Sequence, residues 1–172
     1  MTPRSSTLRR AFVAAAALFA ALMVSACTTT TTGAGDPPRN AAFAPATVDA
    51  RAAAAMISAI RARNGLGPVT VDADLMSRAV NQANAMARAG VMSHTVDGDF
   101  QRRMRGRLNS AAAENIGAGY TSLEAVMASW TASPGHYSNL LLPGATNIGI
   151  AVAFNPNSTY GNFFALILAG PN

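Results

Sequence analysis

The sequence predicts a single domain of the α+β class, with its helices first and its strands last. Apolar residues recur every three or four positions in several segments between residues 48 and 141, a pattern typical of amphipathic helices. Two runs rich in apolar and β-branched residues, "IGIAVAF" and "FFALILA", follow near the C-terminal end. The chain has 172 residues, half of them apolar and few aromatic, which is a globular composition.

The first helix is expected over residues 48–63, with Thr47 as its N-cap and Gly65 beyond its end. Its apolar face consists of Met56, Ile57 and Ile60. The segment "NGLGP" ends this helix, and a short extended piece is expected at residues 69–71.

The second helix is expected over residues 73–89, between an N-cap at Asp72 and a stop at Gly90. An unbroken apolar stripe supports it: Leu75, Ala79, Ala83 and Met86. Residues 91–119 show no sustained period and are expected to form a loop.

The segment "TSLE", residues 121–124, predicts a capping box that opens a third helix, with Glu124 at its third position. The apolar face of this helix consists of Leu123, Val126, Met127 and Trp130, and Trp130 is expected in the core.

Ser133 is expected to cap a fourth, short helix that has Pro134 at its first position and Pro143 beyond its end. The apolar runs at residues 148–154 and 163–169 are expected to pair as an antiparallel hairpin.

The N-terminal residues 1–26 are predicted to be a signal peptide, because basic residues precede an apolar run shorter than the roughly 20 residues that span a bilayer. "VSAC" resembles a bacterial lipobox, which predicts cleavage before Cys27 and lipidation of that cysteine, with palmitate as an acyl chain. The alternative is an ordinary signal peptide followed by a free thiol. Residues 27–47 are then a tether, and residues 48–172 form the folded domain. Thr28 is not acidic, and this favours an outer membrane in a Gram-negative cell.

The formal net charge of +5 falls to +2 without the three signal-peptide arginines, so no nucleic acid is expected as a partner. The segment "QRRMRGR" (Gln101–Arg107, containing the cluster Arg102–Arg107) could hold an anionic lipid head, an envelope phosphate or nucleic acid. The alternative is a solvated loop that one arginine pins to the domain.

Two histidines and a glutamate, His94, Glu114 and His136, each lie near an element boundary, where loops converge on clefts. Two imidazoles and one carboxylate suffice for a divalent metal such as Zn²⁺ with open coordination positions. His136 is expected at the third position of the fourth helix, where the helix dipole disfavours its protonated form. The alternative is two unrelated histidines that each bond to the backbone.

Taken in order, the segments "AMARAGVMSH", "AAENIGAG", "SWTASPGHYSNLL" and "TNIGIAVAF" resemble the bacterial branch of the CAP superfamily, also called SCP-like. The resemblance covers nearly all of residues 48–169. It implies an α-β-α sandwich with a small antiparallel sheet between helical layers. It also implies a cleft with two histidines and two glutamates, and His94, Glu114 and His136 match three of them.

The fourth member is missing, because Ser133 occupies the position of the second glutamate. Glu124 is a poor substitute, since the capping box explains it. Asn115 is expected to order its loop, and Asn139 to fix the turn after the short helix. Tyr137 stands where related bacterial sequences often have arginine, at the rim of the cleft.

A Ser–His hydrolase using Ser133 and His136 is disfavoured, because capping accounts for Ser133 and no G-x-S-x-G elbow is present. The favoured function is an exported, lipid-anchored module of the cell envelope that binds a lipid, glycan or peptide, or has a structural role. The alternative is a metal-dependent, protease-like hydrolase using His94, Glu114 and His136. A third interpretation makes these residues a scaffold for the loop at residues 91–119.

Overall fold

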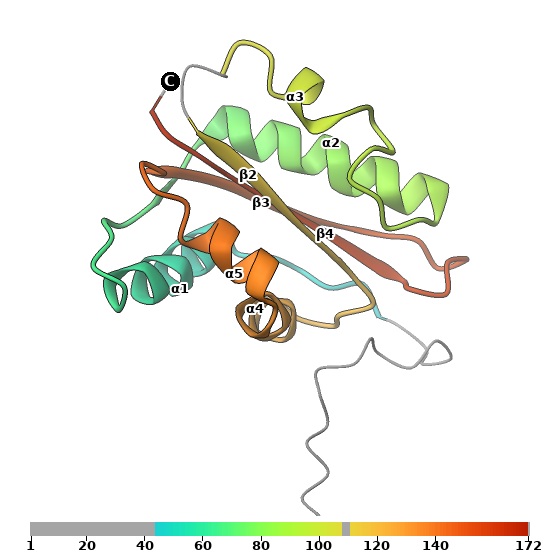
Figure 1. Ribbon diagram of the computed structural model, residues 1–172. Helices are drawn as coiled ribbons and strands as arrows, with labels where there is room; N and C mark the ends of the chain where they lie inside the picture. The colour runs from blue at the N-terminus through green and yellow to red at the C-terminus, as the bar shows by residue number, and fades with distance from the viewer. Residues whose placement is uncertain (1–43, 108–110, 172) are drawn as a thin grey trace, which may run out of the picture. The chain divides into compact units, whose positions relative to one another are not determined.

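A four-stranded sheet lies between two helical layers in the computed structural model (Figure 1). The structure describes residues 44–107 and 111–171. The elements in chain order are α1 (Ala50–Ala62), β1 (Thr70–Val71), α2 (Ala73–Ala89), α3 (Phe100–Arg103), β2 (Ala112–Ala118), α4 (Leu123–Ala132), α5 (Pro134–Leu140), β3 (Asn147–Phe154) and β4 (Asn162–Ala169). This architecture confirms the α+β class and the α-β-α sandwich.

Several predictions concern residues that the structure does not describe. The signal peptide at residues 1–26, the lipidation site Cys27 and the linker up to residue 43 lie outside the described residues. In the part of the chain that is described, no helix has the length and apolar character needed to cross a membrane.

Strand β4 is the centre of the sheet, whose strand order is β1-β3-β4-β2. It pairs antiparallel with β3 on one side and with β2 on the other, whereas β1 pairs parallel with β3. All eight residues of β4 are buried, because helices cover both faces of the sheet. Burial on both faces explains why the sequence of this strand is continuously apolar and does not alternate between apolar and polar residues.

The two faces of β4 belong to two separate hydrophobic cores. Phe163, Ala165 and Ile167 pack against α2 in one core. Phe164, Leu166 and Leu168 pack against α1, α4 and α5 in the other. Figure 1 shows the same division, with α2 over one face of the sheet and α1, α4 and α5 over the opposite face.

Helix α2 begins and ends where the sequence predicts. The Asp72 side chain accepts a hydrogen bond from the Leu75 N–H, and Gly90 ends the helix with a φ of +66°. That left-handed conformation is one that glycine adopts without steric cost. The predicted stripe lies in the core, with Leu75, Ala79 and Met86 all 0% exposed.

The start of α1 differs from its prediction. The helix begins at Ala50 rather than at residue 48, and its cap is Asp49 rather than Thr47. The Asp49 carboxylate accepts from the N–H groups of Arg51 and Ala52.

The capping box predicted at residues 121–124 is wrong by one residue. Ser122 is the cap of α4 and accepts from the Ala125 N–H, so Glu124 occupies the second helical position rather than the third. The predicted apolar face of α4 is buried as expected, and Trp130 is 1% exposed.

The segment at residues 91–119 is not the continuous loop that was expected. It contains the short helix α3, capped by Asp99, and the strand β2. Six of the seven residues of β2 are buried, including Glu114 and Asn115. A strand that buries a carboxylate and an amide lacks the apolar pattern by which strands are identified.

Candidate functional site

His94 and Glu114 meet directly, as the cleft interpretation requires. His94 lies in the turn after α2, and Glu114 points from β2, where its side chain is 2% exposed. The His94 Nδ1 atom lies 2.8 Å from Glu114 Oε1. Because the carboxylate also accepts bonds from an arginine, Nδ1 is the donor, and Nε2 is the ring nitrogen left for other partners. The His94 side chain remains 51% exposed.

Arg103, which sequence reasoning did not assign to the cleft, binds the same carboxylate with two nitrogens. Its Nη1 lies 2.8 Å from Glu114 Oε2, and its Nη2 lies 2.8 Å from Glu114 Oε1. The Nη2 group also donates to the His94 carbonyl at 3.0 Å, and Nε donates to the Gly98 carbonyl at 3.2 Å. The guanidinium carbon lies 5.4 Å from the centre of the Phe100 ring, within range of a cation–π contact.

Two other arginines of the 102–107 cluster, Arg107 and Arg102, have contacts within the domain. Arg107 binds the Asp72 carboxylate at 2.9 Å and the Gly170 carbonyl at 3.4 Å, and its side chain is buried. Arg102 donates to the Asp97 carbonyl at 3.2 Å. The prediction of one pinning arginine is therefore an underestimate, because Arg103 and Arg107 both tie this segment to the domain.

Two buried amides join β2 to α5. Asn115 is 0% exposed and donates from Nδ2 to the His136 carbonyl at 3.0 Å. Asn139 donates to the Asn115 side-chain oxygen at 2.8 Å and to the Glu114 carbonyl at 3.1 Å. The Asn139 side chain therefore connects the short helix to the sheet, while its backbone carbonyl accepts a 3.1 Å bond from the Leu142 N–H in the turn after the helix. Together these amides hold His136 next to the strand that carries Glu114.

His136 occupies the third position of α5, as predicted, and lines a small pocket. The pocket has a volume of about 150 Å³. Its lining is Met92, Ile116, Gly117, Ala118, Tyr120, Ser129, Trp130, Ser133, His136 and Tyr160. The Nδ1 atom of His136 is buried and has no hydrogen-bond partner among the described residues.

Burial lowers the pKa of His136, and the nearby charge of His94 lowers it further. The lowered pKa agrees with the expectation from the sequence that the protonated form of His136 is disfavoured. The causes, however, are desolvation and the second histidine rather than the helix dipole. No hydrogen bond joins His136 to His94 or Glu114 in the described part of the chain. The structure thus pairs two of the three expected residues directly and places the third within electrostatic reach of the first.

Ser133 stands at the junction of α4 and α5 and also lines the pocket of His136. Its side chain makes no capping hydrogen bond, so the expectation that capping engages this hydroxyl is wrong. Two other hydroxyl groups of the pocket lining, those of Tyr120 and Ser129, are hydrogen-bonded to each other at 2.6 Å.

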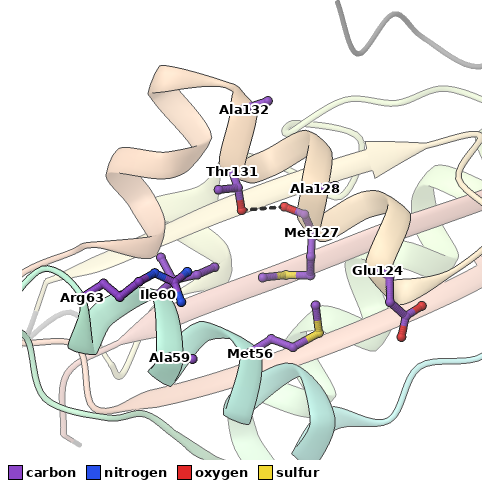
Figure 2. Close-up of a pocket in the computed structure, with 9 residues that line it drawn as sticks. All are labelled: Met56, Ala59, Ile60, Arg63, Glu124, Met127, Ala128, Thr131 and Ala132. Atoms are coloured by element: carbon purple, nitrogen blue, oxygen red, sulfur yellow. Dashed lines mark hydrogen bonds between the residues drawn. The ribbon is translucent and has the colours of Figure 1, made fainter.

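Glu124 belongs to a different cavity, a groove of about 620 Å³ between α1 and α4 (Figure 2). The groove is mostly apolar, and the side chains of Met56 and Met127 lie within it. The backbone N–H of Glu124 itself and the Ser122 hydroxyl lower the pKa of the Glu124 carboxyl, which fits a role at the helix start. Tyr137 likewise turns toward the end of α1, and its hydroxyl accepts a 3.0 Å bond from Nδ2 of Asn64 in the turn after that helix.

The cleft residues, as they lie, do not form an open metal site. Glu114 Oε1 already accepts from His94 and Arg103, and Oε2 accepts from Arg103. Among the described residues, no group of three or more His, Cys, Asp or Glu side chains is arranged to hold a metal ion. A zinc site made of His94, His136 and Glu114 therefore stays a prediction, and it requires Arg103 to release the carboxylate.

Solved bacterial structures share the fold. An outer surface protein of Borrelia burgdorferi matches with a TM-score of 0.61 and 19% identity, over 73% of this chain and 98% of its own. An extracellular SCP-domain protein of Bacillus anthracis matches with a TM-score of 0.59 and 24% identity, over 70% of this chain and 40% of its own. A cysteine-rich secretory protein of Staphylococcus aureus gives a TM-score of 0.55 and 20% identity, over 71% of this chain and 38% of its own. The chain thus spans about two fifths of the length of the last two proteins.

No curated protein gives a significant match to the sequence. The model of one protein family does match, over residues 54–168. These residues include most of α1, every later element up to the penultimate residue of β4, and all of the cleft residues described above. On this match, which covers well over half of its length, the chain belongs to the CAP family, the cysteine-rich secretory protein family.

Proposed function

We propose that this protein is an exported, lipid-anchored binding module of the bacterial cell envelope, and that part of its ligand enters the pocket beside His136. The observation that carries the proposal is the buried Nδ1 atom of His136, which lacks a partner in a pocket of about 150 Å³. A buried polar atom without a hydrogen bond costs free energy, so a bound group that supplies the missing bond is favoured there.

The lining of the pocket restricts the chemistry of that group. Most of it is apolar or aromatic, from Ile116, Ala118 and Trp130, and His136 supplies a hydrogen-bonding nitrogen. A small group with an apolar part and one polar atom fits this description. Acetamido groups of envelope glycans, side chains of peptides and hydroxyl groups of lipids all have this character.

The contacts of Glu114 favour binding over catalysis. A general base or a metal ligand needs a carboxylate oxygen that is free to take a proton or a metal ion. Arg103 and His94 engage both oxygens of Glu114, and Ser133 brings no second carboxylate. The alternative prediction is the metal-dependent hydrolase in which His94 and His136 hold Zn²⁺, and it depends on displacing Arg103.

The binding role is tested with three soluble probes: chitin-type N-acetylglucosamine oligomers, a muropeptide and a long-chain fatty acid. We expect at least one probe to perturb the amide resonances of residues around His136 in ¹⁵N NMR spectra, and to lose affinity in His136→Ala. The matched control is Tyr137→Phe, because that side chain turns away toward α1. Absence of binding by all three probes, or binding that His136→Ala leaves unchanged, contradicts the proposed role.

The export and the anchor are supported by the basic and apolar N-terminal segment and by the lone Cys27 in "VSAC". Two structural relatives are described as an outer surface and an extracellular protein. Lipidation holds a folded domain at a membrane surface without a spanning helix. We place the protein in the outer membrane if the organism is Gram-negative.

Replacing Cys27 by alanine is expected to move the protein from the membrane fraction to the soluble extracytoplasmic fraction. Metabolic labelling with a palmitate analogue should mark the wild-type protein and not the variant. Continued membrane attachment of Cys27→Ala would refute an anchor at this residue.

A further inference from the structure

We infer that Arg103 is a built-in cation that takes the place of a divalent metal ion in the cleft. The inference deepens the proposed binding role, because it excludes metal-dependent ligands at this end of the cleft. Its test measures metal binding and not ligand binding, so the two proposals can fail separately.

The guanidinium group is held from every side. All three of its nitrogens donate hydrogen bonds, to Glu114, to the His94 carbonyl and to the Gly98 carbonyl, and the Phe100 ring lies beneath the charge. The Arg103 side chain is 7% exposed. Arginine stays protonated at any physiological pH, so the positive charge at this position is permanent.

The charges in the cleft balance without a metal ion. Glu114 is a carboxylate whose side chain is 2% exposed, and such a group requires a positive partner in its surroundings. Arg103 supplies one positive charge in a two-pronged arrangement at 2.8 Å for each bond. The formal charges on Glu114 and Arg103 sum to zero, so this ion pair neutralises the buried carboxylate without a further cation.

Metal coordination at Glu114 competes directly with these bonds. Zinc binds carboxylate oxygens at about 2.0–2.2 Å, along the same lone pairs that the N–H donors occupy. The bond from His94 Nδ1 and the bond from Arg103 Nη2 already fill both lone pairs of Oε1. A dication placed there would also lie within a few ångströms of a buried guanidinium, which it repels.

The short helix α3 determines the position of the Arg103 side chain. Arg103 is the last residue of α3, whose N-cap Asp99 accepts a 2.7 Å bond from the Arg102 N–H. The neighbouring Arg102 side chain is exposed and makes one bond to the Asp97 carbonyl. Arg102 is therefore a matched control, with the same residue type on the same helix but no contact with Glu114.

The test uses the full-length protein purified in a neutral detergent and Zn²⁺ alone as the probe. Isothermal titration and thermal melting are compared for the wild type, Arg103→Met, Arg102→Met and the double variant Arg103→Met/His94→Ala. We expect Arg103→Met to bind Zn²⁺ about tenfold more tightly than the wild type, or better, and to melt at a higher temperature when Zn²⁺ is present. Arg102→Met should behave as the wild type, and His94→Ala should abolish the gain.

Arg103→Met leaves Glu114 buried without its partner and can be unstable. In that case, the folded fraction in saturating Zn²⁺, measured by circular dichroism, is the readout, and recovery of the fold supports the inference. Arg103→Gln, which keeps a hydrogen-bond donor and loses the charge, is expected to gain Zn²⁺ affinity in the same direction. Wild-type protein that binds Zn²⁺ through His94 as tightly as either variant overturns the inference, as does a folded Arg103→Met without any gain.

Discussion

Replacing Arg61 by methionine is expected to lower the free energy of unfolding by roughly 3 kcal/mol or more. Arg61 lies in the last turn of α1 and is 2% exposed, yet no carboxylate pairs with it in the described residues. Its nitrogens donate instead to four carbonyls, those of Gly67, Leu140, Leu142 and Ala145, at 2.8–3.0 Å.

These carbonyls explain why the side chain matters. Leu140 ends α5, and Leu142 and Ala145 belong to the turn that leads into β3, so their oxygens lack partners from helix or sheet. Methionine fills a similar volume but donates no hydrogen bond. The Leu142 carbonyl keeps a 3.3 Å bond from the Ala145 N–H, whereas the other carbonyls lose the Arg61 donor. A buried carbonyl that loses its only hydrogen bond costs about 1–3 kcal/mol. Arg61 thus fastens the end of α1 to the segment between α5 and β3.

Urea unfolding of Arg61→Met, followed by circular dichroism, measures the loss. The matched control is Arg63→Met, two residues along the same helix end, where the side chain is exposed beside the groove between α1 and α4. The control should change the free energy of unfolding by less than about 0.5 kcal/mol. Equal effects of the two substitutions would show that the four carbonyls find other partners.

The elements with local signals could be predicted from the sequence. Helix α2 matches at both ends, because Asp72 and Gly90 act on the backbone within one turn of themselves. The strands β3 and β4 match to within one residue, since apolar runs of that length with a polar loop between them leave few alternatives. By contrast, Asp49 rather than Thr47 caps α1, and Ser122 caps α4, because two nearby residues could each cap and only the structure selects one.

Strand β2 could not be predicted for a physical reason. Its polar residues Glu114 and Asn115 are buried, and their partners Arg103 and Asn139 lie 11 and 24 residues away. In a local window of sequence, a carboxylate and an amide interrupt the apolar residues of this segment, and this pattern argues for a loop. Only folding brings Arg103 and Asn139 to these buried polar groups, where their hydrogen bonds offset the cost of burial.

In the candidate site too, some residues could be identified from the sequence and others only from the folded structure. The resemblance to the CAP family identifies His94, Glu114 and His136, and the structure joins the first two at 2.8 Å. Arg103 is one of four arginines within seven residues, and nothing in their spacing distinguishes it from Arg102. The distinction arises from α3, which turns one of these side chains toward β2 and leaves its neighbour exposed.

Replacing Gly149 by alanine is expected to destabilise the protein by about 3 kcal/mol or more, or to prevent folding. Gly149 lies within β3, on the face that α2 covers, and it pairs with Ile167 of β4. A methyl group built on its Cα collides with the backbone of Leu75 and Met76, in the first turn of α2. Backbone atoms cannot rotate away as a side chain can, so the whole helix must move.

This close approach fixes the geometry of the cleft as well as the stability of the core. Helix α2 leads directly into the turn that carries His94, so a shift of α2 away from β3 moves His94 relative to Glu114 on β2. Gly149→Ala should therefore lower the melting temperature and also perturb the His94 ring resonances in NMR spectra of any folded fraction. The control is Gly67→Ala, where a Cβ has open space, and its melting temperature should stay within a few degrees of the wild type. If Gly149→Ala melts as the control does, α2 can slide on the sheet at little cost, and the contact between helix and strand does not determine the position of His94.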